Sequence, residues 1–588
     1  MSVATLRHQV SCPSDFMRTT TVIPLEVSTS EGPAAHHTIL ADPILRSGRP
    51  INTARIAEKT PKVPRTPKTP AKVPAPPTHY ESGGQMWPIP ACSLDSHHCS
   101  QLGHGRLSVK AAFSGATVFI TGASGYVGSV VLEQLLRFAP DVARIYMLIR
   151  GKRGVTGEQR LDNLLKRDLF CKLRDGDEFP EELRRKLVVM GGDLGLPGLG
   201  LSEEDRQTLT REVHYIVHSA ASISFVDHIH NLISHNYIAT KNMAALAADM
   251  RQLRSFLHVS TAYVNCFLGR QKHVEERQYP IMFNGKPMNH AAVIEELQDL
   301  PPKEAESRAA DYLRLTGHVN TYTFTKMLTE MAIGEHHNSS FPVAIVRPSI
   351  VGSIARHPFP GYFGNSAGTT AYFLAYGSGI CTMTCHKAHN VFDVVPGDVV
   401  GSVILTTAAA TVQNKWADRS RPLVVHACSS TTYPYSHYNI YRDSVYPFYQ
   451  QNPCKLRFTL GSYVRHDKQG GMDSFYVDHE SWAFAIRKWL GGAKFYLIRS
   501  LMNALGYTSL AKKVWAGWQA WNTYNTPKLD FQLFFCCNNA RAMTQLQTPE
   551  EAKQMPLTWD IKQDSNTAYF ATHLKYMTTY FFGSKKTA

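Results

Sequence analysis

The chain has 588 residues, more than one hydrophobic core usually holds, so two or three domains are expected. With 43% hydrophobic and 19% charged residues, its composition is that of a globular protein and excludes a fully disordered or fibrous chain. The net charge of +15 is spread out without a long basic block. It is compatible with plain solubility or with an anionic partner such as a phosphorylated ligand, an acidic carrier protein or a membrane surface, and no nucleic-acid partner is assigned.

Residues 1–110 lack the periodicity of the rest of the chain. The segment Thr60–Pro70 repeats proline among basic residues, which blocks helix and sheet and predicts a disordered extension. The first 60 residues are rich in Arg, Ser and Thr and poor in acids, as organellar transit peptides are. A transit peptide and a plain disordered tail are both compatible with this pattern.

The next segment predicts a nucleotide site. The β-type run Thr117–Ile120 leads into TGASGYVG, and an apolar helical pattern follows. A strand, a glycine turn and a helix in this order predict a Rossmann-type dinucleotide site, in which Gly122 makes the tight turn, Gly125 admits a pyrophosphate and Gly128 lets the helix pack closely. The residues assigned to the cofactor here are Thr121, Gly122, Ser124, Gly125, Tyr126, Val127 and Gly128.

A second strand, 145–149, ends in Arg150, Gly151, Lys152 and Arg153, with no acid among them. Arg150 and Arg153 are therefore expected to favour NADP(H), because an NAD site places Asp or Glu at this point. A solvated basic loop is the alternative. An amphipathic helix is expected over 158–173.

Three further strands end in polar or small residues. Strand 187–190 precedes Asp193, which we expect either to bind adenine or to cap a turn. Strand 213–217 precedes His218, interpreted as a packed histidine, and Ala220, on which a cofactor could lie. Strand 256–259 precedes Ser260 and Thr261. All these positions are at the carboxyl ends of strands, where open α/β sheets bind ligands.

Tyr322 and Lys326 are four residues apart at the start of a predicted helix and share one face. A nearby ammonium is expected to lower the pKa of the phenol from about 10 and make Tyr322 a proton donor to a carbonyl. Thr261, or Ser260 in its place, is expected to donate to the same oxygen, and Lys326 to bind the nicotinamide ribose.

The second half continues with a strand near 346–349, a helix over 399–410 and a strand over 422–427, and then becomes aromatic and helical. Residues 496–521 form an amphipathic pattern, which fits an interdomain helix or one lying on a membrane surface. No transmembrane helix is expected. The group 381–389 has no second ligand pair at zinc-like spacing, so no metal is assigned. Eleven irregularly placed cysteines favour a reducing compartment.

The core resembles the extended short-chain dehydrogenase/reductase superfamily, and within it the fatty acyl-CoA reductase, or male-sterility protein, family. The matching segments are TGASGYVG at 121–128, RLDNLLKRDLF at 160–170, GGDL at 191–194, HSAAS at 218–222, STAYVN at 260–265, YTFTK at 322–326, VRPSIVG at 346–352, DVVPGD at 393–398 and the C-terminal stretch 531–561. On this basis Leu194, Ser260, Pro348 and Ile350 join the expected cofactor site.

The resemblance implies an α/β fold: a Rossmann-type doubly wound parallel sheet (111–414), a mostly helical C-terminal domain (415–588) and the N-terminal extension. It implies NADPH-dependent reduction of a long-chain fatty acyl thioester, on coenzyme A or acyl carrier protein, to a primary alcohol through an aldehyde. Aldehyde release, another extended reductase chemistry such as a nucleotide-sugar epimerase or hydroxysteroid dehydrogenase, and a non-catalytic dinucleotide sensor are the alternatives. A plastid location is expected, with the endoplasmic reticulum, the peroxisome membrane or the cytoplasm as alternatives, and peripheral membrane contact is compatible with each membrane location. Oligomeric state and chain length are not predicted.

Overall fold

The computed structural model describes residues 105–582 except 270–271, 284, 338, 365–367, 389, 414–418, 433–434, 455–456, 459–474, 527–531 and 560–565. The extension expected over 1–110 therefore lies, up to residue 104, outside the described residues. Helix α1 (Val109–Phe113) begins before that expected boundary, and Ser108 caps it through the Ala111 N–H.

A seven-stranded sheet forms the centre of the fold. Its strands are β1 (Thr117–Thr121), β2 (Arg144–Leu148), β3 (Leu187–Met190), β4 (Tyr215–His218), β5 (Ser255–Val259), β9 (Val343–Pro348) and β12 (Leu423–Ala427). The order across the sheet is β12-β9-β5-β4-β1-β2-β3, and every neighbouring pair is parallel. The chain order reverses between β1 and β4, which is where doubly wound sheets bind nucleotides. The Rossmann-type fold is confirmed.

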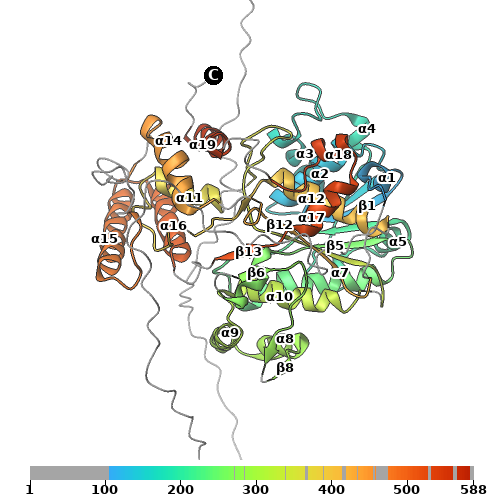
Figure 1. Cartoon of the computed structure of the whole chain (residues 1–588), viewed down its shortest axis with the longest axis horizontal. Coiled ribbons are helices and arrows are strands. Elements are labelled where there is room, and N and C mark those ends of the chain that lie inside the picture. The colour runs from blue at the N-terminus through green and yellow to red at the C-terminus, as the bar shows by residue number, and fades with distance from the viewer. Residues whose placement is uncertain are drawn as a thin grey trace, which may run out of the picture. The chain divides into compact units, whose positions relative to one another are not determined.

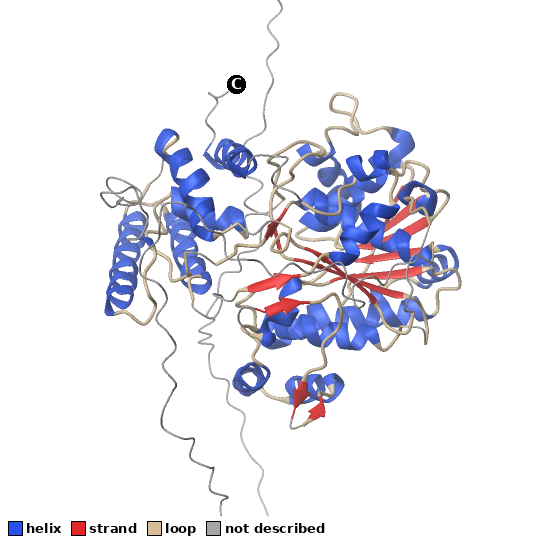
Figure 2. Cartoon of the chain, viewed as in Figure 1, coloured by secondary structure: helices blue, strands red, loops and turns tan. Residues whose placement is uncertain are grey.

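The sheet is covered on both faces, because alternate residues of each buried strand point in opposite directions. Val118 and Ile120 belong to one core, which also contains residues of α2 (Tyr126–Phe138), α3 (Gly157–Leu165) and α12 (Gly397–Val412). Phe119 lies in the opposite core, with residues of α5 (Glu203–Glu212), α7 (Ala239–Ala248) and α10 (Thr321–Gly334). Figures 1 and 2 show the strands between these two helical layers.

Shorter elements connect the main ones. They are η2 (Asp168–Phe170), α4 (Glu181–Arg184), η3 (Pro197–Gly200), α6 (Ile229–Leu232), η4 (Ile233–Ile238), η5 (Ala262–Leu268), β6 (Lys272–Val274), β7 (Met282–Phe283), β8 (Lys286–Pro287), α8 (His290–Asp299), α9 (Pro302–Thr316), β10 (Ile350–Val351), α11 (Thr369–Gly377) and β11 (Val394–Val395). Strands β10 and β11 pair in parallel beside the carboxyl end of β9. Helices α8 and α9 pack against α10, which places them next to the helix that carries Tyr322.

The helix expected over 158–173 is shorter than predicted. Helix α3 ends at Leu165, and Arg167 has extended backbone before the single turn η2. The guanidinium of Arg167 donates to the Ser124 carbonyl at 3.3 Å. The helix therefore breaks at the residue that contacts the glycine turn, and the spacing of apolar residues in this segment does not predict the break.

Residues after 414 are mostly helical, as expected, yet they also complete the sheet. Strand β12 is an edge strand of the main sheet, so the sheet continues past the expected boundary at 414. Strand β13 (Leu533–Phe535) pairs with β6, and α17 (Asn538–Leu546) packs on β12. The remaining elements are α13 (His437–Ile440), η6 (Tyr441–Val445), α14 (Tyr446–Gln451), α15 (Trp482–Ala504), α16 (Thr508–Tyr524), α18 (Pro549–Gln554) and α19 (Asn566–Phe582).

Candidate functional site

The glycine turn between β1 and α2 has little room for side chains. Gly122 has φ of +75°, and a Cβ there would lie 2.8 Å from the Ala220 nitrogen. A Cβ on Gly128 would lie 2.2 Å from the Gly122 carbonyl oxygen. The turn and the close helix packing predicted for these two glycines are therefore confirmed, and the end of β4 lies directly against the turn.

The N-terminus of α2 can receive an anion. Its N-cap is Gly125, and no side chain caps the first turn. The main-chain N–H groups of Tyr126, Val127 and Gly128 begin the helix, where N–H groups and the helix dipole favour a phosphate. The Tyr126 phenol points elsewhere, because its hydroxyl donates to the Gly352 carbonyl at 2.8 Å. Tyr126 can therefore contribute to this site only through its main chain.

Two arginines that sequence analysis did not select reach the glycine turn. Arg160 donates to the Arg150 carbonyl at 2.5 Å and to the Ser124 hydroxyl at 3.4 Å. Arg167 reaches the Ser124 carbonyl. Burial, together with the charges of Arg150 and Arg167, lowers the pKa of Arg160. An anion on this turn would reduce the mutual repulsion of these cations, so the residues fit a phosphorylated dinucleotide. The segment 160–170 quoted for the resemblance contained both arginines, but its spacing did not show that they face the turn.

The predicted NADP-selecting residues have other partners in this structure. Arg150 forms an ion pair with Asp193 at 2.7 Å, and Arg153 lies in an exposed loop with φ of +53°. The other oxygen of Asp193 accepts the Gly195 N–H at 3.0 Å, and these two contacts lower the pKa of its carboxyl. Asp193 thus has the turn role that we considered for it. The Leu194 carbonyl accepts from Asn242 at 2.9 Å.

At the end of β4, His218 is a packed histidine, as predicted. Its ring lies 2.8 Å from the Thr121 hydroxyl and 2.9 Å from the Thr240 hydroxyl. Burial lowers the pKa of His218 to about 3, so the ring is neutral. The Ala220 N–H donates to the Thr121 hydroxyl at 3.3 Å. Thr121 and Ala220 therefore hold β1 and β4 together at the switch point.

The predicted catalytic side chains converge at the ends of β5 and β9. Asn320 caps α10 by accepting the Thr323 N–H at 2.8 Å, which fixes the first turn containing Tyr322. Burial raises the pKa of Tyr322 to about 12, and a hydrogen bond with the Thr261 side chain opposes this rise. The Phe225 ring lies beside the phenol, with 5.6 Å between ring centroids. Tyr322 is thus protonated at neutral pH and is held next to Thr261.

Lys326 is one helical turn further along α10 and only 2% exposed. Its ammonium donates to the Val259 carbonyl at 2.8 Å and lies 3.2 Å from Nε2 of His258. Burial lowers the pKa of Lys326 to about 8. The expectation that Lys326 lowers the pKa of Tyr322 is wrong for this arrangement. The ammonium bonds to His258 and Val259 of β5, and burial is the largest influence on the pKa of the phenol.

His258 is a site residue that sequence analysis missed. An ammonium has only donors, so Nε2 of His258 accepts from Lys326 and the ring proton is on Nδ1. Nδ1 is buried and has no hydrogen-bond partner among the described residues. Burial and the charge of Lys326 lower the pKa of His258 well below its usual value. Position 258 looks like any buried strand residue in the sequence, so no local signal could have found it.

The loop after β9 closes the other side of Thr261. The Thr261 hydroxyl lies 3.5 Å from the Pro348 carbonyl, and the Ser260 N–H donates to Val346 at 2.8 Å. The Ser260 hydroxyl is buried without a hydrogen-bond partner in the described part of the chain. Ile350 begins β10 and is half-buried. The predicted residues Ser260 and Pro348 therefore lie beside Thr261, and Ile350 follows two residues after Pro348.

A buried ion pair ties α10 to β9. Arg347 is bound by both oxygens of Glu330, at 3.0 and 2.5 Å, and the two side chains are 1% and 4% exposed. A third bond, at 2.9 Å, joins Arg347 to the Arg277 carbonyl. Glu330 is four residues after Lys326 on the same helix, so this pair fixes the helix that carries the predicted catalytic residues Tyr322 and Lys326.

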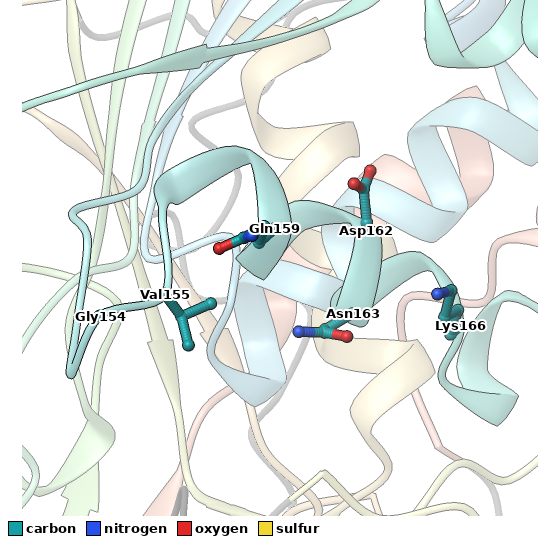
Figure 3. Close-up of a pocket in the computed structure, with 6 residues that line it drawn as sticks. All are labelled: Gly154, Val155, Gln159, Asp162, Asn163 and Lys166. Atoms are coloured by element: carbon teal, nitrogen blue, oxygen red, sulfur yellow. The ribbon is translucent and has the colours of Figure 1, made fainter.

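A hollow of about 490 Å³ lies beside α3, outside the catalytic group (Figure 3). Its lining residues are Gly154, Val155, Gln159, Asp162, Asn163 and Lys166, all of them exposed. It contains neither the glycine turn nor Tyr322, so we locate the candidate site by the strand ends instead. Within the ranges that the structure describes, no group of three or more His, Cys, Asp and Glu side chains is placed to hold a metal ion.

The residues of the candidate site lie in a segment that matches a known domain family. Residues 120–404 match the family model described as male sterility protein. Over 361 residues the chain is 34% identical to fatty acyl-CoA reductase 1 of Pongo abelii and to that of Homo sapiens, covering 60% of this chain and 65% of each relative. The chain thus spans less than two thirds of the length of these relatives.

A comparison of structures finds the terminal R domain from the myxalamid PKS-NRPS biosynthetic pathway, at 19% identity and a TM-score of 0.46. It covers 82% of this chain and 93% of that domain. The sequence match, by contrast, includes the glycine turn and the Thr261, Tyr322 and Lys326 side chains. Residues 120–404 are thus similar to the male sterility protein family, and the chain is similar over 361 residues to proteins named fatty acyl-CoA reductase 1.

Proposed function

We propose that this protein reduces a long-chain fatty acyl thioester to a primary alcohol, through an aldehyde, with NADPH. The observation that carries the proposal is the Thr261 and Tyr322 pair, hydrogen-bonded to each other at the carboxyl edge of a sheet whose switch point holds the glycine turn. The relatives named fatty acyl-CoA reductase support the choice of substrate class.

NADPH bound at the glycine turn would supply the hydride. Gly122, the first turn of α2, Arg160 and Arg167 would hold its phosphates, by the geometry described above. The small residues at the end of β4 leave the main chain of that edge accessible to its rings. Lys326, whose ammonium donates to the Val259 carbonyl, would bind its nicotinamide ribose.

The protein's own part in the reaction is to hold an oxygen and move a proton. The Thr261 hydroxyl and the Tyr322 phenol donate to the thioester oxygen and stabilise the charge that develops there as the carbon accepts hydride. Tyr322 then gives its proton to that oxygen, and a hemithioacetal forms. A phenol with a pKa of about 12 is protonated at every working pH, which suits the reducing direction.

Collapse of the hemithioacetal completes the first half. The carbon–sulfur bond breaks, the hydroxyl proton passes to sulfur, and the thiol leaves an aldehyde behind. The aldehyde oxygen occupies the same position between Thr261 and Tyr322 and accepts a second hydride and a second proton. One thioester thus consumes two hydrides and two protons and gives one alcohol and one thiol.

The test is to incubate the purified full-length protein and its Tyr322→Phe variant with palmitoyl- or stearoyl-CoA and NADPH. Gas chromatography should find fatty alcohol with the wild-type protein and a loss of about 10²- to 10⁴-fold in the variant. Tyr312→Phe is the control. The Tyr312 hydroxyl, on α9, donates to Glu296 of α8 and takes no part in the proposed site. If neither aldehyde nor alcohol forms from acyl-CoA of any chain length tested, the proposal is wrong.

The thiol carrier, the product and the location are finer parts of the proposal. Parallel assays with acyl carrier protein thioesters would distinguish the carrier, and aldehyde accumulating without alcohol would identify an aldehyde-releasing enzyme. We propose a plastid location on the composition of the first 60 residues. A fluorescent fusion of residues 1–110 should then enter plastids. A uniform cytosolic, reticular or peroxisomal signal would contradict the plastid location.

A further inference from the structure

His258 is a buried histidine of β5 whose ring meets Lys326 of α10. The His258 side chain is 1% exposed, and its Nε2 lies 3.2 Å from the Lys326 ammonium. The carbonyl of the next residue, Val259, accepts from the same ammonium at 2.8 Å. Lys326 thus has two adjacent acceptors on one buried strand. Because an ammonium carries three N–H donors, these contacts leave one donor for a cofactor hydroxyl.

A second histidine fixes the His258 ring. His218 of β4 and His258 of β5 are partners across the parallel strand pair, and their ring centroids are 5.6 Å apart. The hydroxyls of Thr121 and Thr240 bond to the two nitrogens of the His218 ring, at 2.8 and 2.9 Å. A ring bonded at both nitrogens cannot turn without breaking these bonds. The surface against which His258 packs is therefore held in place from β1 and β4.

Both acceptors of the Lys326 ammonium are neutral. An ammonium donates to Nε2 of His258 only if that nitrogen carries no proton, so the single ring proton is on Nδ1. Burial and the charge of Lys326 lower the pKa of His258 and that of His218, which keeps both rings neutral. The carboxylate of Glu330 opposes the effect of burial on the pKa of Lys326, but both of its oxygens are bound by Arg347.

Acceptors on the N–H groups therefore matter for the charge of Lys326. Burial of an ammonium favours the neutral amine, whereas each hydrogen bond to its N–H groups favours the charged form. One hydrogen bond to a charged group changes a pKa by about one to two units. Loss of the imidazole acceptor should thus make Lys326 easier to deprotonate and should free its side chain to move.

We propose that His258 is a positioning residue for the reduction, whose Nε2 holds the Lys326 ammonium on β5 and leaves its third N–H for the ribose of NADPH. The inference rests on the proposed use of NADPH at this site. His258 acts through Lys326 and is assigned no contact of its own with substrate or cofactor.

The test is the pH dependence of kcat, measured on the full-length protein with palmitoyl-CoA and NADPH. In the wild type, kcat should begin to fall near pH 8, where Lys326 titrates. His258→Leu has a similar volume but no acceptor, so the fall should begin about one to two pH units lower. His258→Gln offers an amide oxygen to the ammonium and should restore the wild-type profile.

The matched control is another buried histidine. His426 lies in β12, is fully buried and bonds to the Cys536 carbonyl at 2.8 Å. His426→Gln should leave the pH at which kcat falls where it is in the wild type. A shift in this control equal to that of His258→Leu would show that loss of any buried imidazole changes the profile, and would overturn the proposal.

Binding of NADPH provides a measurement that needs no turnover. At pH 7 Lys326 is mostly charged in the wild type and should be about half neutral or more in His258→Leu. NADPH fluorescence should therefore show an affinity about twofold to tenfold weaker for this variant, and no change for His258→Gln. If no acyl-CoA is reduced at all, the proposed function fails, and this order of affinities still tests the role of His258.

His258→Phe is a second variant without an acceptor, and it keeps an aromatic ring against His218. Whichever of the Leu and Phe variants unfolds within a few degrees of the wild type is used for the comparison. If its kcat profile and NADPH affinity equal those of the wild type, Lys326 does not depend on His258. If His258→Gln shifts as far as the acceptor-free variant, packing rather than the acceptor is responsible, and the proposal is equally wrong.

The ring tautomer tests the wild-type protein directly. Nitrogen NMR of protein labelled at its histidines should find the His258 proton on Nδ1 at neutral pH, with the resonances assigned by their loss in His258→Gln. A proton on Nε2 would leave no acceptor for Lys326 and would overturn the proposal without any measurement of activity.

Discussion

The cofactor half and the catalytic half of the proposed site are built from different materials. The glycine turn is main chain: Gly122 and Gly128 matter because they lack side chains, and the helix that follows is left uncapped. The catalytic half is made of buried ionisable side chains, in which Lys326 bonds to His258 and β5 while Glu330 binds Arg347. Its chemistry therefore depends on what surrounds each charge.

This difference predicts different failures. Substitutions in the turn should act by displacing the backbone, whereas substitutions in the catalytic half should act by leaving a charge unpaired or by changing its protonation. The largest effect is expected where a buried charge loses its partner, because burial strengthens both the attraction and the penalty.

Glu330→Gln should lower the free energy of unfolding by about 3–5 kcal/mol, since it leaves the Arg347 guanidinium buried without a counter-charge. Urea denaturation followed by circular dichroism would measure the loss. Glu181→Gln is the matched control: its pair with Arg185 is surface-exposed, at 69% and 76%, and should contribute about 0–1 kcal/mol. Equal losses in the two variants would show that the buried pair does not hold α10 to β9.

Gly128→Ala should cost about 1–3 kcal/mol, because the added Cβ would lie 2.2 Å from the Gly122 oxygen and α2 must move away from the turn. Binding of NADPH, followed by its fluorescence, should weaken together with stability. Gly191→Ala is the control, since a Cβ there meets no atom within 4 Å. A Gly128 variant as stable as this control would contradict the close packing.

The contrast between the two halves also explains what the sequence could predict. The turn was predictable because φ and close approach are local properties of glycine, and the spacing of Gly122, Gly125 and Gly128 encodes them. Tyr322 and Lys326 were predictable as a pair because helical spacing is local. The pKa of Tyr322 was not, since it depends on burial by residues from other elements.

Other errors have the same origin. His258 alternates with its strand neighbours like any core residue, and only the folded sheet brings Lys326 to it. Arg160 and Arg167 were expected on one continuous helix, but α3 ends at Leu165, and each guanidinium reaches Ser124 from a different element. The amphipathic pattern over 496–521 belongs to two helices, because Gly506 reverses the chain within it.

Arg160→Gln tests the part of the cofactor half that lies beside the glycine turn. It removes a cation that lies at the turn, so the affinity for NADPH should fall about 10- to 100-fold, the range for hydrogen bonds to charged groups. Arg185→Gln, on an exposed surface, is the control and should bind NADPH as the wild type does. If Arg160→Gln leaves NADPH affinity unchanged, the phosphates do not reach this arginine.

The same assay with NADH separates two roles of Arg160. An arginine that contacts the 2′-phosphate would weaken NADPH binding alone, because NADH lacks that group. An arginine that contacts the pyrophosphate would weaken both cofactors equally. The affinities of Arg150→Gln for NADPH and NADH should be compared with those of Arg160→Gln. The Arg150 substitution also breaks the ion pair with Asp193.

The last prediction is a pH dependence that belongs to the catalytic half and is small near pH 7. The pKa of Lys326 is about 8, below its usual value, so its charge is present at pH 7 and is lost as the pH rises through 8. Tyr322, with a pKa of about 12, keeps its proton over this range. If the charged ammonium is required, kcat should fall about tenfold per unit above pH 8. Lys326→Arg stays charged, so its kcat should be lower at pH 7 but should not fall between pH 7 and 10. A fall in this variant as steep as in the wild type would assign the titration to a group other than Lys326.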